Sequence, residues 1–459
     1  MIKVSLLEIA NAVRGELTGN GELTITNVVT DSRQVVEGSL FIAIQGEKVD
    51  GHNFIPNAYE QGAVCVICDR YPRLVPKGKA CVVVRDTKKA ILELASYYRD
   101  QFHIPIVGVT GSVGKTTTKE FVYSVLSMGY NTCKTEGNYN NEIGLPLTVF
   151  RLERDTQALV LEMGMSGFGE IEALTNVAKP YIGIITNIGT AHLENLGSRE
   201  GILKAKLEIV KGIAPNGYLL LNKDEPLLNG VRLKRDINVL YYGINDKTAD
   251  VYAEDIEEFD DYTTFSIKGK IEKDVRINTV GLHNVYNALA AACVGYLLGI
   301  GPNKMAEGLL RFHNVGMRQN IYEKNGVTVI DDCYNANPDS VKAALQVLEA
   351  RKGRHIAVLG DMLELGNFAE LGHREVGVFA RQHGTDILLC CGDQTQWTVD
   401  SYMKNREPEQ EAAFFSCKAH LGRFLKNTLR PGDVVLFKGS RGMAMEEIIP
   451  MAFGEAPVR

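Results

Sequence analysis

A glycine-rich segment that ends in lysine and threonine is the strongest chemical signal in this sequence. It runs from Gly108 to Thr117 as Gly-Val-Thr-Gly-Ser-Val-Gly-Lys-Thr-Thr and follows the apolar segment Ile106–Val109, which we expect to be a strand. In such a loop, backbone N–H groups and the start of the next helix bind phosphates, the lysine reaches the β- and γ-phosphates, and the following hydroxyl can ligate Mg²⁺. Its first glycine comes one position earlier than in the strict phosphate-loop pattern. We predict a nucleotide phosphate site centred on Lys115 and Thr116.

Two other side chains with metal-binding chemistry follow predicted strands. Glu162 ends the apolar segment Ala158–Glu162, and His192 comes shortly after Tyr181–Ile185. The carboxyl ends of parallel strands are where ligands collect, so Glu162 is a candidate Mg²⁺ ligand. The alternatives are a solvated glutamate at a strand end and a structural histidine.

The next candidates are lysines and asparagines. Lys204 and Lys206 lie in a helical pattern, where two solvated surface lysines are the plain interpretation. A lysine held close to phosphates and a metal could instead react with CO₂ and become an anionic carbamate. The segment Gly137–Gly144 is rich in asparagine and suits a sugar or amide ligand, although a polar turn explains it equally well.

Two segments near the C-terminus also place charged residues directly after predicted strands. Asp331–Pro338 follows a strand and precedes a helix, which places carboxylates where a ribose could bind, or an Asn or Asp where a helix needs an N-cap. Lys438–Arg441 is a basic, glycine-containing turn that suits an anionic substrate group.

The elements that must position these residues indicate an α/β protein of three domains, because 459 residues exceed one hydrophobic core. Residues 1–100 predict a small α/β domain, with strands in 40–44, 64–67 and 81–84. Residues 101–312 predict a central parallel sheet of the phosphate-loop ATPase type, with an appended antiparallel hairpin formed by 263–267 and 275–279. Residues 313–459 restart the strand and helix alternation, which predicts a Rossmann-like domain.

Composition excludes several classes of protein. A formal charge of −6 supplies no general attraction for nucleic acid, so we expect no nucleic-acid partner. No apolar run approaches the ~20 residues that span a bilayer, so we expect no membrane insertion and a cytoplasmic location. The pair Cys65 and Cys68 lies in an apolar run without further metal ligands nearby, which favours a buried strand. A monomer is the default expectation.

Taken together, these segments resemble the Mur ligase family, the ATP-dependent amide ligases that build the bacterial cell-wall precursor. The similarity covers the whole chain and is carried by ordered motifs. They are Thr30–Arg33, Gly46, Asp50–His52, Thr110–Thr116, Gly137–Pro146, Glu162–Met165, Thr186–Gly189 with His192, His283–Asn287, Asp332–Pro338, Leu359–Gly366 and Lys438–Arg441.

The resemblance implies an enzyme that couples ATP hydrolysis to amide formation through an acyl phosphate. It implies UDP-N-acetylmuramoyl-tripeptide and D-alanyl-D-alanine as substrates, bound by the first and third domains, with ATP and two Mg²⁺ ions at the central domain. The implied ATP-binding residues are Thr110, Gly111, Ser112, Gly114, Lys115, Thr116, Thr117, Asn287, Arg318 and Asp332.

The resemblance also assigns roles to the remaining candidates. Lys115, Lys206 and His192 are the implied catalytic residues, with Lys206 as the carbamylated lysine. The implied metal-binding residues are Thr116, Glu162, His192 and Lys206. The implied substrate-binding residues are Ser32, Arg33, Asn138, Asn141, Asn335, Lys438, Ser440 and Arg441.

Three alternatives stay open from the sequence. One is a sister ligase, either the one that adds the third amino acid to the same precursor or a folylpolyglutamate synthase. The Asp-Asn-Pro-Arg motif with which the diaminopimelate-adding sister reads its amino acid is absent. Another is a regulatory GTPase, because Asn222–Glu225 imitates a guanine motif, although Glu225 stands where that motif needs aspartate. The last is a nucleotide-binding scaffold without catalysis.

Overall fold

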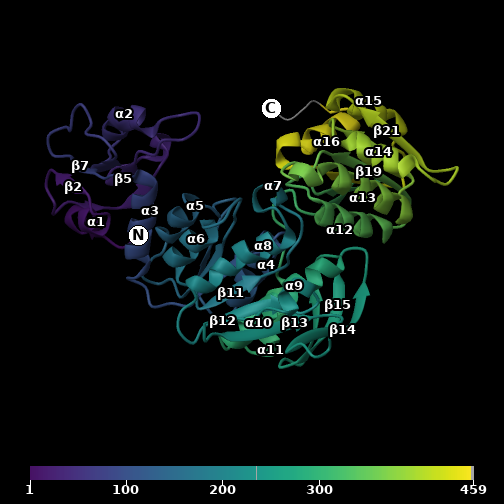
Figure 1. The fold of residues 1–459 in the computed structure, drawn as a ribbon, viewed down its shortest axis with the longest axis horizontal. Coiled ribbons are helices and arrows are strands. Elements are labelled where there is room, and N and C mark those ends of the chain that lie inside the picture. Colours follow the sequence, from purple (N-terminus) through teal and green to yellow (C-terminus); the bar gives the residue numbers. More distant parts are fainter. Residues whose placement is uncertain (234, 456–459) are drawn as a thin grey trace.

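The computed structural model describes residues 1–233 and 235–455 and contains three large β-sheets, each with its own helices. The sheets follow one another along the chain and form an open arc, with the first and third at its two ends and the second between them (Figure 1). The three-part α/β organisation predicted from the sequence is confirmed. The boundaries near residues 100 and 312 stay predictions.

The first sheet has five strands in the order β2-β7-β6-β5-β4. Its strands are β2 (Glu16–Thr18), β4 (Asn27–Val29), β5 (Ser39–Ile42), β6 (Cys65–Cys68) and β7 (Ala80–Val83), and its helices are α1 (Leu6–Ala12), α2 (Ile55–Glu60) and α3 (Thr87–Arg99). The same part of the chain forms a short two-stranded antiparallel sheet of β1 (Val4–Ser5) and β3 (Thr24–Ile25). Cys65 and Cys68 are free and fully buried in β6, as the apolar pattern predicts.

The second sheet has nine strands in the order β16-β15-β14-β13-β12-β11-β8-β10-β9. They are β8 (Ile106–Thr110), β9 (Thr132–Lys134), β10 (Ala158–Glu162), β11 (Ile182–Ile185), β12 (Tyr218–Asn222), β13 (Asn238–Gly243), β14 (Val251–Glu258), β15 (Thr263–Gly269) and β16 (Lys273–Ile277). Strands β8 to β14 pair in parallel, whereas β14, β15 and β16 are antiparallel, which confirms the predicted hairpin.

Helices cover both faces of the second sheet. They are α4 (Lys115–Leu126), α5 (Gly144–Val149), α6 (Glu170–Ala178), α7 (Leu193–Leu196), α8 (Arg199–Lys206), α9 (Pro226–Asn229), α10 (Leu282–Leu297) and α11 (Pro302–Leu310). Successive strand residues point to opposite faces, so Val107 and Val109 pack with α4, α10 and α11, whereas Leu159 and Leu161 pack with α5 and α6. Both faces are therefore buried, as a parallel sheet requires.

The third sheet has six strands in the order β17-β18-β22-β19-β20-β21. They are β17 (Asn320–Lys324), β18 (Val327–Asp331), β19 (Arg354–Gly360), β20 (Ile387–Cys391), β21 (Glu411–Phe415) and β22 (Asp433–Lys438), and all except the edge strand β17 pair in parallel. The accompanying helices are α12 (Pro338–Glu349), α13 (Ala369–Gln382), α14 (Thr395–Met403), α15 (Lys418–Thr428) and α16 (Ile448–Ala452). This is the Rossmann-like domain that the sequence predicts.

The hydrophobic cores show how the three sheets are joined. One continuous cluster contains buried residues of the first sheet, such as Leu40, and of the second, such as Leu159. Helix α3 connects them, because the Tyr98 ring packs edge-on against Phe150, 5.9 Å between centroids, and its hydroxyl donates to the Leu152 carbonyl at 2.8 Å. The core of the third sheet consists of separate clusters.

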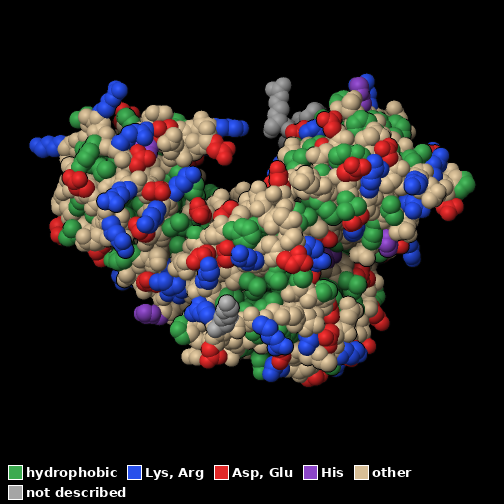
Figure 2. All heavy atoms as spheres, viewed as in Figure 1, with side chains coloured by type: hydrophobic (Ala, Val, Ile, Leu, Met, Phe, Trp, Pro, Cys, Tyr) green, Lys and Arg blue, Asp and Glu red, His purple; other side chains and the backbone are tan. Residues whose placement is uncertain are grey.

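The surface of the molecule is hollowed between the first and third sheets, above the second (Figure 2). Charged side chains of both signs are mixed over the face shown there. Within the described ranges, no helix combines the length and the apolar character needed to cross a membrane.

Candidate active site

The predicted phosphate loop lies at the carboxyl end of β8, in the interior of the second sheet, and leads into α4. Gly114 caps this helix with a φ of 83°, and its missing Cβ would lie 2.7 Å from the Asn287 side chain, so the position requires glycine. The Lys115 ammonium donates to the Gly111 carbonyl at 2.9 Å. The loop therefore has the left-handed turn and helix start that a phosphate cradle needs.

The phosphate loop is held from the side by Thr186 and Asn187, the two residues that follow β11. The Asn187 side-chain oxygen accepts hydrogen bonds from the backbone N–H groups of Ser112 at 3.1 Å and Val113 at 2.9 Å. The Thr186 hydroxyl donates to the Val113 carbonyl at 2.6 Å. The loop conformation is thus set by a neighbouring strand as well as by its own glycines.

Glu162 and Thr116 form an oxygen-donor pair beside the loop. The Thr116 hydroxyl donates to Glu162 Oε2 at 2.8 Å, and the Asn140 amide donates to Oε1 at 2.9 Å. Within the described residues, no group of three or more His, Cys, Asp or Glu side chains could hold a metal. Mg²⁺ fits this pair nevertheless, because it is usually bound by one or two protein oxygens together with substrate phosphates and water.

His192 borders the same cavity from the start of α7, where its φ is 64°. Its Nδ1 atom lies 2.9 Å from the Glu364 carboxylate, which belongs to the third sheet's part of the chain. Proximity to His192 lowers the pKa of Glu364. The histidine therefore lies at the junction between the second and third sheets.

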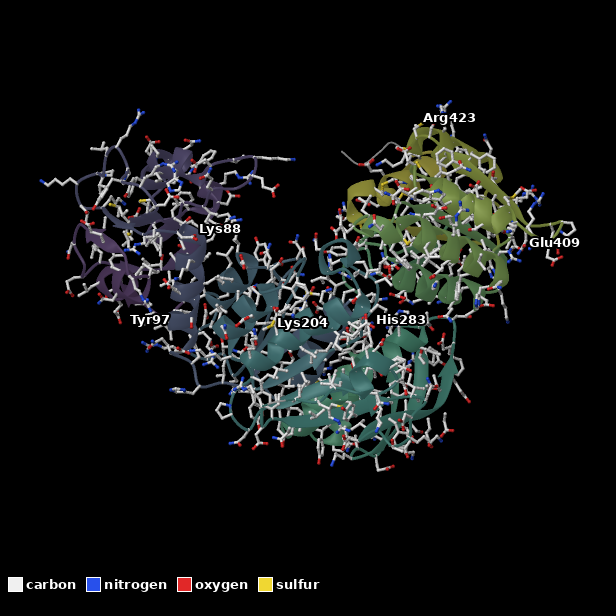
Figure 3. The ribbon with its side chains drawn as sticks, in the orientation of Figure 1. Lys88, Tyr97, Lys204, His283, Glu409 and Arg423 are labelled. Carbon is white, nitrogen blue, oxygen red and sulfur yellow. The ribbon has the colours of Figure 1, made fainter. Side chains whose placement is uncertain are left out.

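The two lysines of α8 differ in burial. Lys204 is exposed, and its ammonium lies 5.4 Å from the centre of the Phe168 ring (Figure 3). Lys206 is only 1% exposed, and its Nζ atom has no hydrogen bond or ion pair to any residue of 1–233 or 235–455. Burial, with a further contribution from the nearby Lys115, lowers the pKa of Lys206 well below its usual value. A neutral amine of this kind can react with CO₂, whereas Lys204 cannot benefit from burial.

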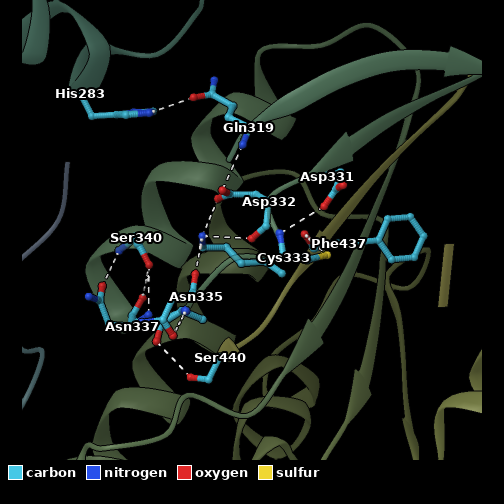
Figure 4. A network of polar contacts seen from close by, with 12 residues as sticks. His283, Gln319, Asp331, Asp332, Cys333, Asn335, Asn337, Ser340, Phe437 and Ser440 are labelled. Carbon is cyan, nitrogen blue, oxygen red and sulfur yellow. Dashed lines mark hydrogen bonds and ion pairs between the residues drawn. The ribbon is translucent and has the colours of Figure 1, made fainter. Parts of the chain in front are cut away.

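The third sheet supplies the opposite wall. Asp332 follows β18, forms an ion pair with Lys438 at the end of β22, and accepts a hydrogen bond from the Gln319 backbone N–H at 3.1 Å (Figure 4). The Arg318 guanidinium stacks 3.7 Å over the Tyr334 ring. Asn337 caps α12 through reciprocal bonds with Ser340, which confirms the N-cap interpretation for that residue. The ribose-binding role of Asp332 stays a prediction.

Gln319 joins the two walls. Its side-chain oxygen lies 3.0 Å from His283 Nε2 (Figure 4). The same oxygen accepts from the Asn284 amide at 2.9 Å, and the Gln319 amide donates to the Val280 carbonyl at 2.9 Å. Burial lowers the pKa of His283, which lies at the junction of the middle and third parts of the ribbon (Figure 3). The start of α10 is thus connected to Asp332 through one residue.

These walls enclose a cavity of about 370 Å³. Among the predicted site residues, those that line it are Ser112, Gly114, Lys115, Thr116, Thr117, Asn141, Glu162, His192, Asn287, Arg318, Asp332, Asn335 and Lys438. Burial lowers the pKa of Lys115, with Arg318 adding to the shift and Glu162 opposing it. The cavity combines a glycine-rich loop that suits phosphates, an oxygen-donor pair that suits Mg²⁺ and a carboxylate that suits a ribose.

The other predicted residues lie outside the cavity lining. Thr110 and Gly111 form the base of the loop. Lys206 is buried near Lys115, and Asn138 is exposed in the asparagine-rich turn. The Ser440 hydroxyl accepts from the Leu363 N–H at 2.9 Å.

Two of these positions form ion pairs with a neighbouring carboxylate. Arg441 forms an ion pair with Glu446 and is half-exposed. In the first sheet's part of the chain, Ser32 is buried and Arg33 is exposed beside Asp31. The substrate-binding roles of Ser32, Arg33, Asn138, Ser440 and Arg441 stay predictions.

Sequence reasoning missed several residues of the site. Asn140, Asn187 and Gln319 are the clearest, since each directly holds a predicted site residue. Each lies next to a residue or within a motif that the sequence marked. Which of several neighbouring amides faces the site depends on backbone geometry that periodicity does not reveal.

The guanine-type motif has a different function in the structure. The Asp224 carboxylate accepts hydrogen bonds from the backbone N–H groups of Ile244, Asn245 and Asp246 and from the Tyr286 hydroxyl. It therefore orders the loop after β13. Glu225, which stands where that motif needs its base-binding aspartate, accepts a hydrogen bond from the Arg199 guanidinium at 2.8 Å, and this contact argues against the GTPase interpretation.

Models of known protein families match three successive parts of the chain. They are the Mur ligase family catalytic domain over residues 24–99, the Mur ligase middle domain over 109–295, and the Mur ligase glutamate ligase domain over 317–441. Each match falls on one of the three large sheets with its helices.

Full-length relatives give the same result. The chain is 40% identical over 454 residues to the UDP-N-acetylmuramoyl-tripeptide–D-alanyl-D-alanine ligase of Bacillus subtilis, covering 98% of both chains. A crystal structure of MurF from Acinetobacter baumannii superposes with a TM-score of 0.92 at 31% identity, covering 99% of both chains. MurF of Thermotoga maritima in complex with ADP gives a TM-score of 0.84 at 30% identity, covering 94% of this chain and 97% of that one. With three family models in order and whole-length similarity, this chain belongs to the Mur ligase family of ATP-dependent ligases.

Proposed function

We propose that this enzyme joins D-alanyl-D-alanine to UDP-N-acetylmuramoyl-tripeptide, with ATP converted to ADP and phosphate. The observation that carries the choice of substrates is the similarity, over 98% of both chains, to the Bacillus subtilis ligase with that name. The cavity between the second and third sheets supports the ATP-dependent part of the reaction, since a phosphate cradle faces Asp332 and Lys438 across it. A relative that was crystallised in complex with ADP supports the use of an adenine nucleotide.

The residues of the cavity have separate roles in this proposal. Lys115 and the backbone N–H groups from Gly111 to Thr117 bind the phosphates and stabilise the charge that develops on the transferred group. Asn287 and Arg318 orient the adenine and phosphate parts, and Asp332 accepts from the ribose hydroxyls. The tripeptide carboxylate attacks the γ-phosphate, and the neutral amine of the dipeptide then displaces phosphate from the acyl phosphate.

Thr116, Glu162 and His192, with Lys206 as a carbamate, would hold two Mg²⁺ ions beside these phosphates. Such ions supply Lewis-acid stabilisation of phosphate oxygens. The donor pair of Thr116 and Glu162 and the buried, unpaired amine of Lys206 support these assignments. The enclosing third sheet would keep water from the acyl phosphate.

The remaining site assignments concern the substrates. We assign Ser32 and Arg33 to the uridine nucleotide, Asn138 and Asn141 to the sugar-peptide, and Asn335, Lys438, Ser440 and Arg441 to the dipeptide. Domains of residues 1–100, 101–312 and 313–459 and a cytoplasmic monomer complete the proposal.

Phosphate release tests the function directly. We expect release from ATP only when both UDP-N-acetylmuramoyl-tripeptide and D-alanyl-D-alanine are present, measured with a coupled phosphate assay. Lys115→Ala should reduce turnover by about 100-fold or more, because the negative charge on the transferred phosphoryl group loses the lysine ammonium that stabilises it. The circular dichroism spectrum should be unchanged. Equal release with a free amino acid in place of the dipeptide would indicate a sister ligase instead.

A further inference from the structure

Lys119 is a buried lysine that lies one helical turn after Lys115, outside the cavity lining. It is 1% exposed, and lysine is almost never fully buried unless it is paired. Its ammonium donates to the Thr135 carbonyl at 2.7 Å and lies 3.1 Å from Glu120 Oε1. It also lies 3.8 Å from Glu162 Oε2, the oxygen that accepts from Thr116. A fixed positive charge therefore stands behind the proposed metal-binding carboxylate.

The orientation of Glu162 does not depend on this lysine. Thr116 and Asn140 each hold one carboxylate oxygen, at 2.8 and 2.9 Å, and the Glu162 backbone N–H donates to the Thr135 hydroxyl at 3.0 Å. Both oxygens and the backbone are thus held by neutral groups. What Lys119 adds to Glu162 is charge.

The charge pattern around the carboxylate provides an internal comparison. Glu120 is shared by two lysines, with Lys119 at Oε1 and Lys134 at Oε2. Lys134 is 18% exposed and lies 4.2 Å from the centre of the Tyr123 ring; within the described residues it makes no ion pair with Glu162. The two lysines have the same partner, but only Lys119 reaches the metal-binding carboxylate.

We propose that Lys119 is a fixed counter-charge for Glu162 that prevents the nucleotide-free enzyme from binding a divalent cation tightly, so that the metal is retained only together with nucleotide phosphates. This inference rests on the proposed metal-binding role of Glu162. The physical cause is Coulomb repulsion over a few ångströms in a partly buried site. Because Lys119 does not line the cavity, phosphates neutralise Lys115 but leave Lys119 in place.

Mn²⁺ binding to the nucleotide-free protein tests this proposal. Mn²⁺ substitutes for Mg²⁺ at oxygen sites, and the signal of the free ion in electron paramagnetic resonance falls as the ion binds. Lys119→Met should bind Mn²⁺ about tenfold more tightly than the unmodified enzyme, from the Coulomb term alone. Lys119→Arg, which keeps the charge, should behave like the unmodified enzyme. Lys134→Met is the matched control and should change the affinity by less than about twofold.

Three outcomes would overturn the proposal. They are an unchanged or weaker Mn²⁺ affinity in folded Lys119→Met, an equal gain in Lys134→Met, and a gain that persists when Glu162→Gln is added. If Lys119→Met does not fold, Lys119→Met with Glu120→Gln removes both members of the pair and should show the same gain. Loss of Mn²⁺–ADP binding in Glu162→Gln alone tests the metal-binding role separately, so failure of the one is distinguishable from failure of the other.

Discussion

At the scale of residues, the site buries lysines that a folded protein would normally keep in water. Lys206 has no partner among the described residues, and its pKa lies well below the usual 10.5 because burial disfavours the charged form. Below pH 10.5 the unfolded chain binds a proton that the folded chain has to release, so folding becomes less favourable as the pH falls. The buried amine therefore lowers stability at neutral pH.

Lys206→Met should accordingly stabilise the protein while inactivating it. We expect a gain of about 1–3 kcal/mol at pH 7, since an unpaired buried polar group is replaced by an apolar one. The gain should shrink as the pH approaches 10.5. Calorimetric or urea unfolding at several pH values measures it, and a loss of stability at pH 7 would contradict the unpaired state of this amine.

The carbamate assignment makes a separate prediction. Lys206→Ala should lose ligase activity, and added formate or acetate should restore part of it, because a small carboxylate can occupy the space of the missing carbamate. Lys204→Ala, from the same helix, is the matched control and should remain active because Lys204 is exposed. Full activity in Lys206→Ala would contradict the carbamate assignment.

The sequence predicts which residues line the site better than it predicts which side chains contact them. The sequence marks Lys115, Glu162 and Asp332 through motifs at strand ends, and all three line one cavity. It does not show that Asn140, rather than Asn141, holds Glu162, because a turn without periodicity does not reveal where each side chain points. The contact of Gln319 with His283 depends on how two sheets dock, which no local pattern encodes.

At the scale of elements, the start of α4 depends on one backbone conformation. Gly114→Ala would place a Cβ at a φ of 83° and 2.7 Å from Asn287 Oδ1, which disturbs both the loop and a proposed adenine contact. We expect ADP affinity to fall by about tenfold or more, measured by calorimetric titration, with the overall fold retained.

Gly78→Ala is the control for that substitution. Gly78 has a similar φ of 82°, but nothing lies within 4 Å of the point that an alanine Cβ would occupy. It should therefore cost about 1–2 kcal/mol of stability from backbone strain and leave ADP affinity unchanged. A matching loss of ADP affinity in both variants would show that global destabilisation, rather than the loop, is responsible.

The elements themselves were largely predictable, but their order in the sheets was not. The apolar run Ala158–Glu162 matches β10 to the residue, and the runs at 40–44, 64–67 and 81–84 match β5, β6 and β7 to within two residues. The segments 263–267 and 275–279 likewise fall on the hairpin of β15 and β16. The insertion of β22 between β18 and β19 brings Lys438 beside Asp332, although more than a hundred residues separate them. Such long-range pairing is decided by packing of whole elements.

At the scale of the whole molecule, the nucleotide would contact two sheets at once. ADP binding should therefore slow amide hydrogen exchange both in the phosphate loop and in Asp332–Ser340, because each wall of the cavity is stabilised by the shared ligand. Lys115→Ala should reduce protection in both segments together. Protection confined to the phosphate loop would mean that the third sheet does not take part in nucleotide binding.

The continuous core of the first and second sheets has a consequence for substrate length. Because α3 fixes these two sheets to each other, while the third sheet has its own core, the surface of the first sheet and the phosphate loop stand at a constant separation. A substrate anchored at one end by its nucleotide can present its reactive carboxylate to the loop only if its peptide spans that gap. The fixed separation would therefore select substrates by peptide length. A UDP-linked substrate whose peptide is one residue shorter should bind but not react.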